Sequence, residues 1–202
     1  INDKLLEAAG KVLTSKKSIS QNISNTLNAL AKFGYTKNEL NKSINNKLLE
    51  AAGKVLTSKK SISQNISNTL NALAKFGYTK EEFNKSINNE LLEAAGRVFA
   101  NSSKPQEISN TLNALAKFGY TKEEFNKNIN DGILFGAIEK VFANSSKPQE
   151  ISNTLNALAK FSYTKYELNE SINNEMLEAA EKVFADDNNS SQSISNTLNA
   201  LV

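Results

Sequence analysis

The sequence contains no cysteine, no histidine and no tryptophan. These absences exclude disulfides, metal sites built on thiolate or imidazole ligands, and nucleophilic catalysis by a Ser–His or Cys–His arrangement. Neither a pair of catalytic carboxylates nor a phosphate-binding glycine loop stands out among the remaining residues. We therefore expect a protein that is not an enzyme and that has no cofactor, no metal site and no small-molecule substrate.

Long apolar runs are also absent. No segment approaches the roughly 20 apolar residues that a transmembrane helix needs, and the N-terminus has no signal segment. We therefore expect no membrane partner. The sequence starts without methionine, partway through a repeat, and we expect it to be part of a longer protein with more repeats.

The formal net charge is only +3, but the charge is unevenly distributed along the chain. When the sequence is divided at Ile44, Ile87, Ile129 and Ile172, the five segments carry net charges of +4, +4, 0, −1 and −4. A polyanionic partner would therefore prefer the N-terminal half of the chain.

One short segment recurs five times. SNTLNAL begins at Ser24 and returns at Ser67, Ser109, Ser152 and Ser195, so that its asparagine recurs after 43, 42, 43 and 43 residues. Such a period is typical of helical arrays, in which each unit buries its apolar face against its neighbours. The sequence therefore predicts an all-α fold, a curved α-solenoid of stacked two-helix repeats. The predicted repeats are residues 1–43, 44–86, 87–128, 129–171 and the incomplete 172–202.

The first helix of each repeat has clear start and stop signals. Ser18 and Gln21 match a capping box that recurs in the next three repeats, from Ser61, Ser103 and Ser146. Apolar residues spaced three and four apart from Ile19 to Phe33 predict an amphipathic helix. Gly34 and its counterparts Gly77 and Gly119 supply the left-handed residue that ends it, whereas Ser162 predicts a weaker end in the fourth repeat.

The second helix is predicted to begin at once. In YTKNEL (residues 35–40), Thr36 and Glu39 match a capping box, and the flanking tyrosine and leucine match a hydrophobic staple. The apolar stripe that follows predicts one unbroken helix of about 20 residues. The alternative is a break near Asn45 and Asn46, which gives three helices per repeat. We attribute the glycines inside this helix to close contact between helices: Gly10, Gly53, Gly96 and Gly136.

The polar face of the first helix repeats the residue types Gln, Asn, Asn and Lys. Steps of four, three and four residues from Gln21 place these side chains on a narrow arc. When repeats stack, the amides form a ladder beside a row of lysines, which could hold a phosphodiester backbone while amides meet base edges. One neighbouring position varies and is the expected selector of the ligand: Asn22, Asn65, Glu107, Glu150 and Ser193.

The candidate RNA-binding residues follow from this ladder and from the variable position. They are Asn22, Asn25, Asn28, Lys32, Asn65, Asn68, Asn71, Lys75, Glu107, Asn110, Asn113, Lys117, Glu150, Asn153, Asn156 and Lys160. Two other interpretations stay open: the glutamines cap their helices, and the asparagines form a solvated face. The tyrosines at 35, 78, 120 and 163 could stack on bases, but the staple explains them better.

The segment ISNTLNALAKFGYTKEEF (residues 108–125) resembles the octotricopeptide-type repeats and the related helical repeats of FAST-kinase-family and RAP-domain proteins. It is most similar to a short, Asn- and Lys-rich version found in proteins of intracellular bacteria. The resemblance implies an α-solenoid that binds RNA through its first helices, in the bacterial cytoplasm or after export to a host cell. The family's tryptophan is replaced by Asn28 and its counterparts, and the repeats are longer than usual.

The sequence thus supports two functional hypotheses. The first is a non-catalytic, modular protein that binds single-stranded RNA. The alternative is a protein–protein interaction scaffold without nucleic-acid binding, including a secreted bacterial effector. The incomplete last repeat leaves one apolar face uncapped, which predicts end-to-end contact with another molecule.

Overall fold

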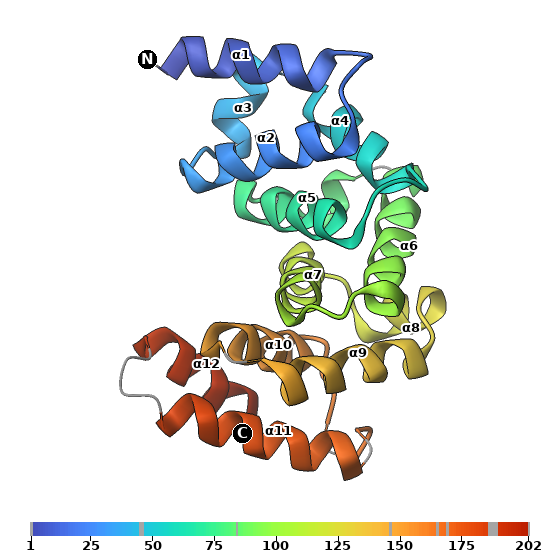
Figure 1. The fold of residues 1–202 in the computed structure, drawn as a ribbon, viewed down its shortest axis with the longest axis vertical. Helices are drawn as coiled ribbons and strands as arrows, with labels where there is room; N and C mark the ends of the chain where they lie inside the picture. Colours follow the sequence, from blue (N-terminus) through green and yellow to red (C-terminus); the bar gives the residue numbers. More distant parts are fainter. Residues whose placement is uncertain are drawn as a thin grey trace.

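The chain forms an all-helical structure without β-strands in the residues that the computed structural model describes (Figure 1). The all-α prediction is therefore confirmed. The described residues are 2–44, 47–83, 85–145, 147–164, 166–168, 170–185 and 190–201.

The five helices that carry SNTLNAL lie side by side in one row (Figure 1). Each of them contacts the next one in the row. On α5 the buried face consists of Ile66, Leu70 and Leu73, which recur at steps of four and three as one face of a helix requires. This first row comprises α2 (Ser20–Lys32), α5 (Ser63–Phe76), α7 (Pro105–Phe118), α10 (Pro148–Lys160) and α12 (Ser191–Leu201).

A second row of helices packs behind the first and follows the same order. Successive helices of the second row contact one another, and each also contacts its neighbours in the first row. Apolar side chains of both rows form one continuous core that extends from Leu6 to Val183. The second row comprises α1 (Asn2–Thr14), α4 (Lys47–Thr57), α6 (Lys85–Asn101), α9 (Asp131–Asn144) and α11 (Glu170–Ala185).

Short helices connect the two rows, so the prediction of one unbroken second helix is wrong. They are α3 (Lys37–Ser43), the 3-10 helix η1 (Lys80–Glu82) and α8 (Lys122–Asn128). Where the third repeat joins the fourth, the backbone is extended at Ile129 and Asn130, and the Asn130 side chain caps α9 by accepting from the Gly132 N–H at 2.8 Å. An asparagine that caps a new helix competes with helix continuation. The predicted alternative, a break near Asn45 and Asn46, lies outside the described residues. A break at the equivalent place occurs before α9, whereas α6 and α11 continue through residues 88–89 and 173–174 and begin a few residues earlier.

The Thr–Glu capping boxes are confirmed, and their carboxylates also join successive repeats. The Thr79 N–H donates to Glu82 Oε2 at 2.9 Å, and Lys37 of the preceding repeat donates to Glu82 Oε1 at 2.6 Å. The same relation recurs between Lys80 and Glu124 at 2.7 Å and between Lys122 and Glu167. The Lys37 hydrogen bond holds the pKa of Glu82 below its usual range.

The predicted Ser–Gln capping box is wrong. Helix α2 begins after Ile19, and Ser18 Oγ donates instead to the Val12 carbonyl of the preceding helix at 2.7 Å. In the third repeat α7 begins after Lys104, whose N–H donates to Ser102 rather than to Ser103. The serine thus belongs to the loop before the helix, which a spacing of three residues could not reveal. Ser146 lies outside the described residues.

The glycines at the ends of the first-row helices have the expected left-handed backbone. Gly34, Gly77 and Gly119 have φ of 81°, 86° and 84°, and Ser162 adopts the same region with φ of 60°. A side chain in this conformation is strained because Cβ approaches the following carbonyl oxygen. The prediction of a weaker helix end in the fourth repeat is consistent with this geometry.

The glycines inside the second-row helices are not sites of close helix contact, so that prediction is wrong. A Cβ added at Gly10 or Gly136 would meet no atom within 4 Å. At Gly53 and Gly96 it would make ordinary contacts, 3.9 Å from Glu90 Oε2 and 3.6 Å from Ile129 Cγ1. These positions could hold alanine without displacing a neighbour.

The last repeat exposes apolar side chains. Leu198 on α12 is 50% exposed, whereas its counterpart Leu155 on α10 is 1% exposed. On α11, Leu177 and Phe184 are 53% and 40% exposed. End-to-end contact through this face remains a prediction. Among the described residues, no helix combines the length and the apolar character that crossing a bilayer requires.

The strain at Ser162 gives a direct test of the helix ends. Replacement Ser162→Gly should raise the free energy of unfolding by about 1 kcal/mol because glycine adopts positive φ without a steric cost. The reverse change at the third repeat, Gly119→Ser, should lower it by a similar amount. Urea unfolding followed by circular dichroism measures both, and a stabilising Gly119→Ser would contradict this explanation.

Candidate functional site

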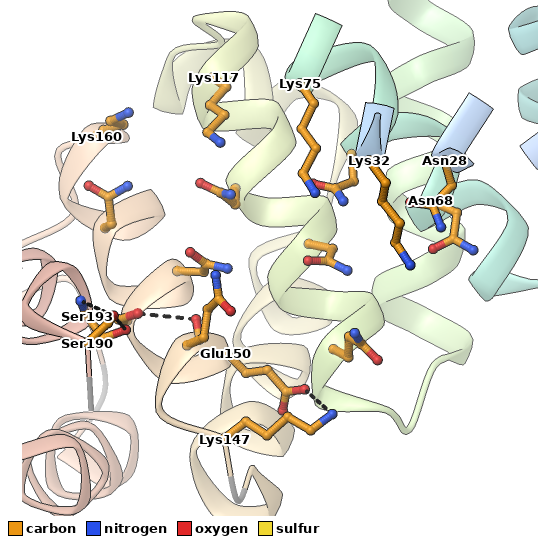
Figure 2. Close-up of a pocket in the computed structure, with 18 residues that line it drawn as sticks. Asn28, Lys32, Asn68, Lys75, Lys117, Lys147, Glu150, Lys160, Ser190 and Ser193 are labelled. Carbon is orange, nitrogen blue, oxygen red and sulfur yellow. Dashed lines mark hydrogen bonds and ion pairs between the residues drawn. The ribbon is translucent and has the colours of Figure 1, made fainter. Parts of the chain in front are cut away.

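The first row of helices presents a polar groove of about 620 Å³ (Figure 2). Its lining comes from successive repeats and contains only amide, hydroxyl, ammonium and carboxylate side chains. The lining residues are Asn28, Lys32, Asn68, Asn71, Lys75, Gln106, Asn110, Asn113, Lys117, Lys147, Gln149, Glu150, Ser152, Asn153, Asn156, Lys160, Ser190 and Ser193. We call this surface the amide groove.

Helical spacing explains how each repeat contributes to the amide groove. On α5, Asn68, Asn71 and Lys75 lie three and four residues apart, so they share one helix face. Both asparagines are half-buried between adjacent helices, and the lysine is exposed. Two asparagines from each of α5, α7 and α10, with Asn28 of α2, therefore form the floor, and the lysine lies where each of these helices ends.

Four lysines from successive helices follow one another along the rim of the amide groove (Figure 2). This lysine row consists of Lys32, Lys75, Lys117 and Lys160. None of the four forms an ion pair with any residue that the structure describes. Partial burial lowers the pKa of Lys117 from its usual value, and the charges of Lys160 and Lys75 lower it further. Four like charges thus face one site, and no described carboxylate pairs with them. This arrangement favours binding of an anion.

Most of the predicted site residues meet in the amide groove. Four do not: Asn22 and Asn25 are exposed outside its lining, and Asn65 and Glu107 are 7% and 8% exposed. The predicted residues that line it are Asn28, Lys32, Asn68, Asn71, Lys75, Asn110, Asn113, Lys117, Glu150, Asn153, Asn156 and Lys160.

The variable position anchors a loop in the third and fourth repeats. Its interpretation as a ligand selector is wrong for the third repeat, where Glu107 lies outside the groove lining, and stays a prediction for the fourth, where Glu150 lines it. Glu107 Oε2 accepts from Ser102 Oγ at 2.7 Å, and Lys104 Nζ lies 3.3 Å from Glu107 Oε1. Glu150 repeats this arrangement with Ser145 at 2.7 Å. Although Glu150 borders the amide groove, its carboxylate is already occupied by the loop.

The second and fifth repeats use the same position for different local contacts. Asn65 Oδ1 accepts from Ser24 Oγ of the preceding repeat at 3.3 Å, and Ser193 Oγ lies 3.0 Å from Ser190 Oγ. The residue at this position changes together with the loop before it, from SKKSISQN to SSKPQE. That shared change was the sequence signal for an anchor.

Two glutamines and two loop residues add to the predicted groove residues. Gln106 and Gln149 line the amide groove, as their place on the polar face of the first helix predicts. Lys147 and Ser190 reach it from the loops that precede α10 and α12. No spacing rule places loop residues on a helical face, so only the stacked structure reveals them.

Two of the tyrosines are part of the buried core. Tyr78 and Tyr120 are 4% and 5% exposed and do not line the amide groove. Tyr78 stacks on Phe83 with ring centroids 5.9 Å apart, as the hydrophobic staple predicts. Burial raises the pKa of Tyr120 well above its usual value. Base stacking on these two rings is therefore excluded without local unfolding.

A search of the described part of the chain finds no cluster of carboxylates that could hold a metal ion. Comparison with protein-family models and with curated proteins gives no match. Among solved structures, the crystal structure of an engineered protein is similar, with 15% identity and a TM-score of 0.44 over 97% of this chain and 96% of that one. The resemblance to octotricopeptide-type repeats remains a prediction.

The anchor role of Glu107 can be tested by stability. Replacement Glu107→Ala should lower the free energy of unfolding by about 1–3 kcal/mol because it leaves the buried Ser102 hydroxyl without its acceptor. The exposed counterpart gives the control, since Asn22→Ala should change stability by less than about 0.5 kcal/mol. Equal effects of the two replacements in urea unfolding would contradict the anchor role.

Proposed function

We propose that the chain is an α-solenoid that binds single-stranded RNA in the amide groove. The observation that carries the proposal is the lysine row: four ammonium groups on consecutive repeats beside a floor of amides, with no ion-pair partner among the described residues. The solenoid assignment is supported by the two parallel rows of helices and their shared core.

Charge favours an extended polyanion over a single small anion. One lysine projects from each of four neighbouring helices, and packed helices lie roughly 8–10 Å apart. A polymer with regularly spaced phosphates meets all four lysines in turn, whereas a small anion meets only one or two. Burial lowers the pKa of Lys117 most, and repulsion by Lys160 and Lys75 lowers it further; a bound phosphate would relieve that repulsion.

The amide floor favours a single strand. Side-chain amides both donate and accept hydrogen bonds, so they suit the edges of unpaired bases. An RNA duplex hides its base edges in a deep and narrow major groove, whereas a single strand can present them to the protein. Because none of the described residues that line the groove is aromatic, bases would be held by hydrogen bonds rather than by stacking.

A protein-binding scaffold is the second candidate. The observation that favours it is the exposure of Phe33 and Tyr166, which are 71% and 87% exposed and lie outside the amide groove. Large exposed aromatic side chains are enriched at protein interfaces. A protein partner of this kind would not depend on the lysine row.

Salt dependence tests the proposed function. Fluorescence anisotropy with a labelled single-stranded RNA should give an affinity that falls with a log–log slope of about −3 if four phosphates are contacted, since each contributes about −0.7. Between about 50 and 200 mM salt the dissociation constant should therefore rise roughly fiftyfold. An RNA duplex of the same sequence should bind more weakly.

The groove is tested by paired charge reversals. The double replacement Lys75→Glu with Lys117→Glu should abolish binding because it places carboxylates in the middle of the lysine row. The matched control Lys59→Glu with Lys60→Glu changes the net charge equally at an exposed loop and should retain binding. Equal loss in both variants would show nonspecific attraction, and binding that survives the groove replacement would reject the proposal.

A further inference from the structure

The first two repeats carry a second charged surface that the amide groove does not use. It lies on the loops before α2 and α5, where the sequence SKKSIS occurs twice, at residues 15–20 and 58–63. We call these two segments the Lys-Ile loops. Each contributes two lysines and one isoleucine.

The Lys-Ile loops expose both charge and apolar surface. Ile19 and Ile62 are 60% and 59% exposed, among the largest values for aliphatic side chains in the described chain. The four lysines are exposed and form no ion pair with a described residue. They are Lys16, Lys17, Lys59 and Lys60.

Hydrogen bonds give the two loops the same conformation and hold them together. The Lys17 N–H donates to Ser15 Oγ at 3.2 Å, and the Lys60 N–H donates to Ser58 Oγ at 3.3 Å. Between the loops, Ser61 Oγ donates to Ser20 Oγ at 2.6 Å. The Ser61–Ser20 hydrogen bond therefore places the two Lys-Ile loops next to each other.

The fold does not require this composition. At the position of Ile19 and Ile62, the third and fourth repeats have Lys104 and Lys147, each next to a buried glutamate. Those loops compensate their own charge, with Lys104 Nζ 3.3 Å from the carboxylate of Glu107. In the first two repeats an asparagine replaces the glutamate, so the loops keep their positive charge and expose an aliphatic side chain.

The combination of charge and aliphatic side chains narrows the class of partner. RNA would use the lysines but would offer nothing to the isoleucines. Neither Ile19 nor Ile62 lines the amide groove or the second hollow beside Lys117 and Lys160, so the Lys-Ile loops are separate from both. An anionic bilayer accommodates both features, because its headgroups attract lysines and its acyl boundary accepts aliphatic side chains.

We propose that the Lys-Ile loops dock this protein on the surface of an anionic phospholipid bilayer. Ile19 and Ile62 enter the boundary between headgroups and acyl chains, and the four lysines lie on the headgroups. The attachment is peripheral and reversible. It departs from the sequence-based expectation of no membrane partner, which rested on the absence of a spanning segment.

Vesicle sedimentation tests this docking. The chain should sediment with vesicles of phosphatidylcholine and phosphatidylserine and remain in solution with phosphatidylcholine alone. The double replacement Ile19→Ser with Ile62→Ser should lower the partition coefficient at least about tenfold because it removes the inserted aliphatic side chains. The charge reversal Lys59→Glu with Lys60→Glu should lower it by at least about tenfold through the loss of headgroup attraction.

Two controls distinguish vesicle binding through the Lys-Ile loops from nonspecific hydrophobic adsorption and from RNA binding. The replacement Ile133→Ser removes another exposed isoleucine, on α9, and should leave sedimentation unchanged. The groove variant Lys75→Glu with Lys117→Glu should still bind vesicles while losing RNA, so either proposal can fail without the other. Thermal unfolding confirms that every variant is folded.

Three results would overturn the proposal. The first is no sedimentation with phosphatidylserine vesicles, and the second is undiminished sedimentation of the double isoleucine variant. The third is binding of an acidic, leucine-containing peptide through the same loops by a chain that does not sediment with vesicles. That last result would assign the surface to a protein partner.

Discussion

Burial of apolar surface between consecutive repeats is the constraint on which the rest of this structure depends. A single repeat has apolar residues on more than one side and cannot cover them itself, whereas the stacked repeats share one core. Leu27, Leu70 and Leu112 occupy the same position of successive helices and are fully buried. Full burial of each such side chain is worth about 1.5–3 kcal/mol, so the array is stabilised mainly at the joints between repeats. The Lys–Glu contacts at the capping boxes lie at these joints and favour the same register.

That register also creates the amide groove. Once the leucines of SNTLNAL face the core, the two asparagines of the same segment must face outward, because helical spacing couples the two faces. Repetition of the joint then aligns the amides and places one lysine per repeat along the rim (Figure 2). The candidate site is therefore a consequence of how the core packs. Core packing constrains the sequence of the loops before the first-row helices less. These loops differ between the first two repeats and the next two, for example at Ile62 and its counterpart Lys104.

The sequence correctly predicted the features that depend on interactions between residues close together in the chain. The Thr79–Glu82 capping box, the left-handed Gly77 and the face that carries Asn68, Asn71 and Lys75 all follow from short-range spacing. It failed where the outcome depends on a neighbouring repeat. Glu107 looked like an exposed variable residue, yet it is buried because the preceding loop folds over it. Gly136 looked like a packing glycine, yet no neighbour approaches it. The break before α9 depends on whether Asn130 caps a new helix or continues the old one, a small energetic difference that propensity alone cannot decide.

Lysine footprinting shows whether the lysine row is the surface that contacts a polyanion. Brief acetylation of the folded protein, with and without single-stranded RNA, followed by mass spectrometry, reports the accessibility of every lysine in one experiment. We expect strong protection of Lys32, Lys75, Lys117 and Lys160 by RNA and little change at the loop residues Lys59 and Lys60. Protection spread evenly over all exposed lysines, or confined to the loops, would contradict it.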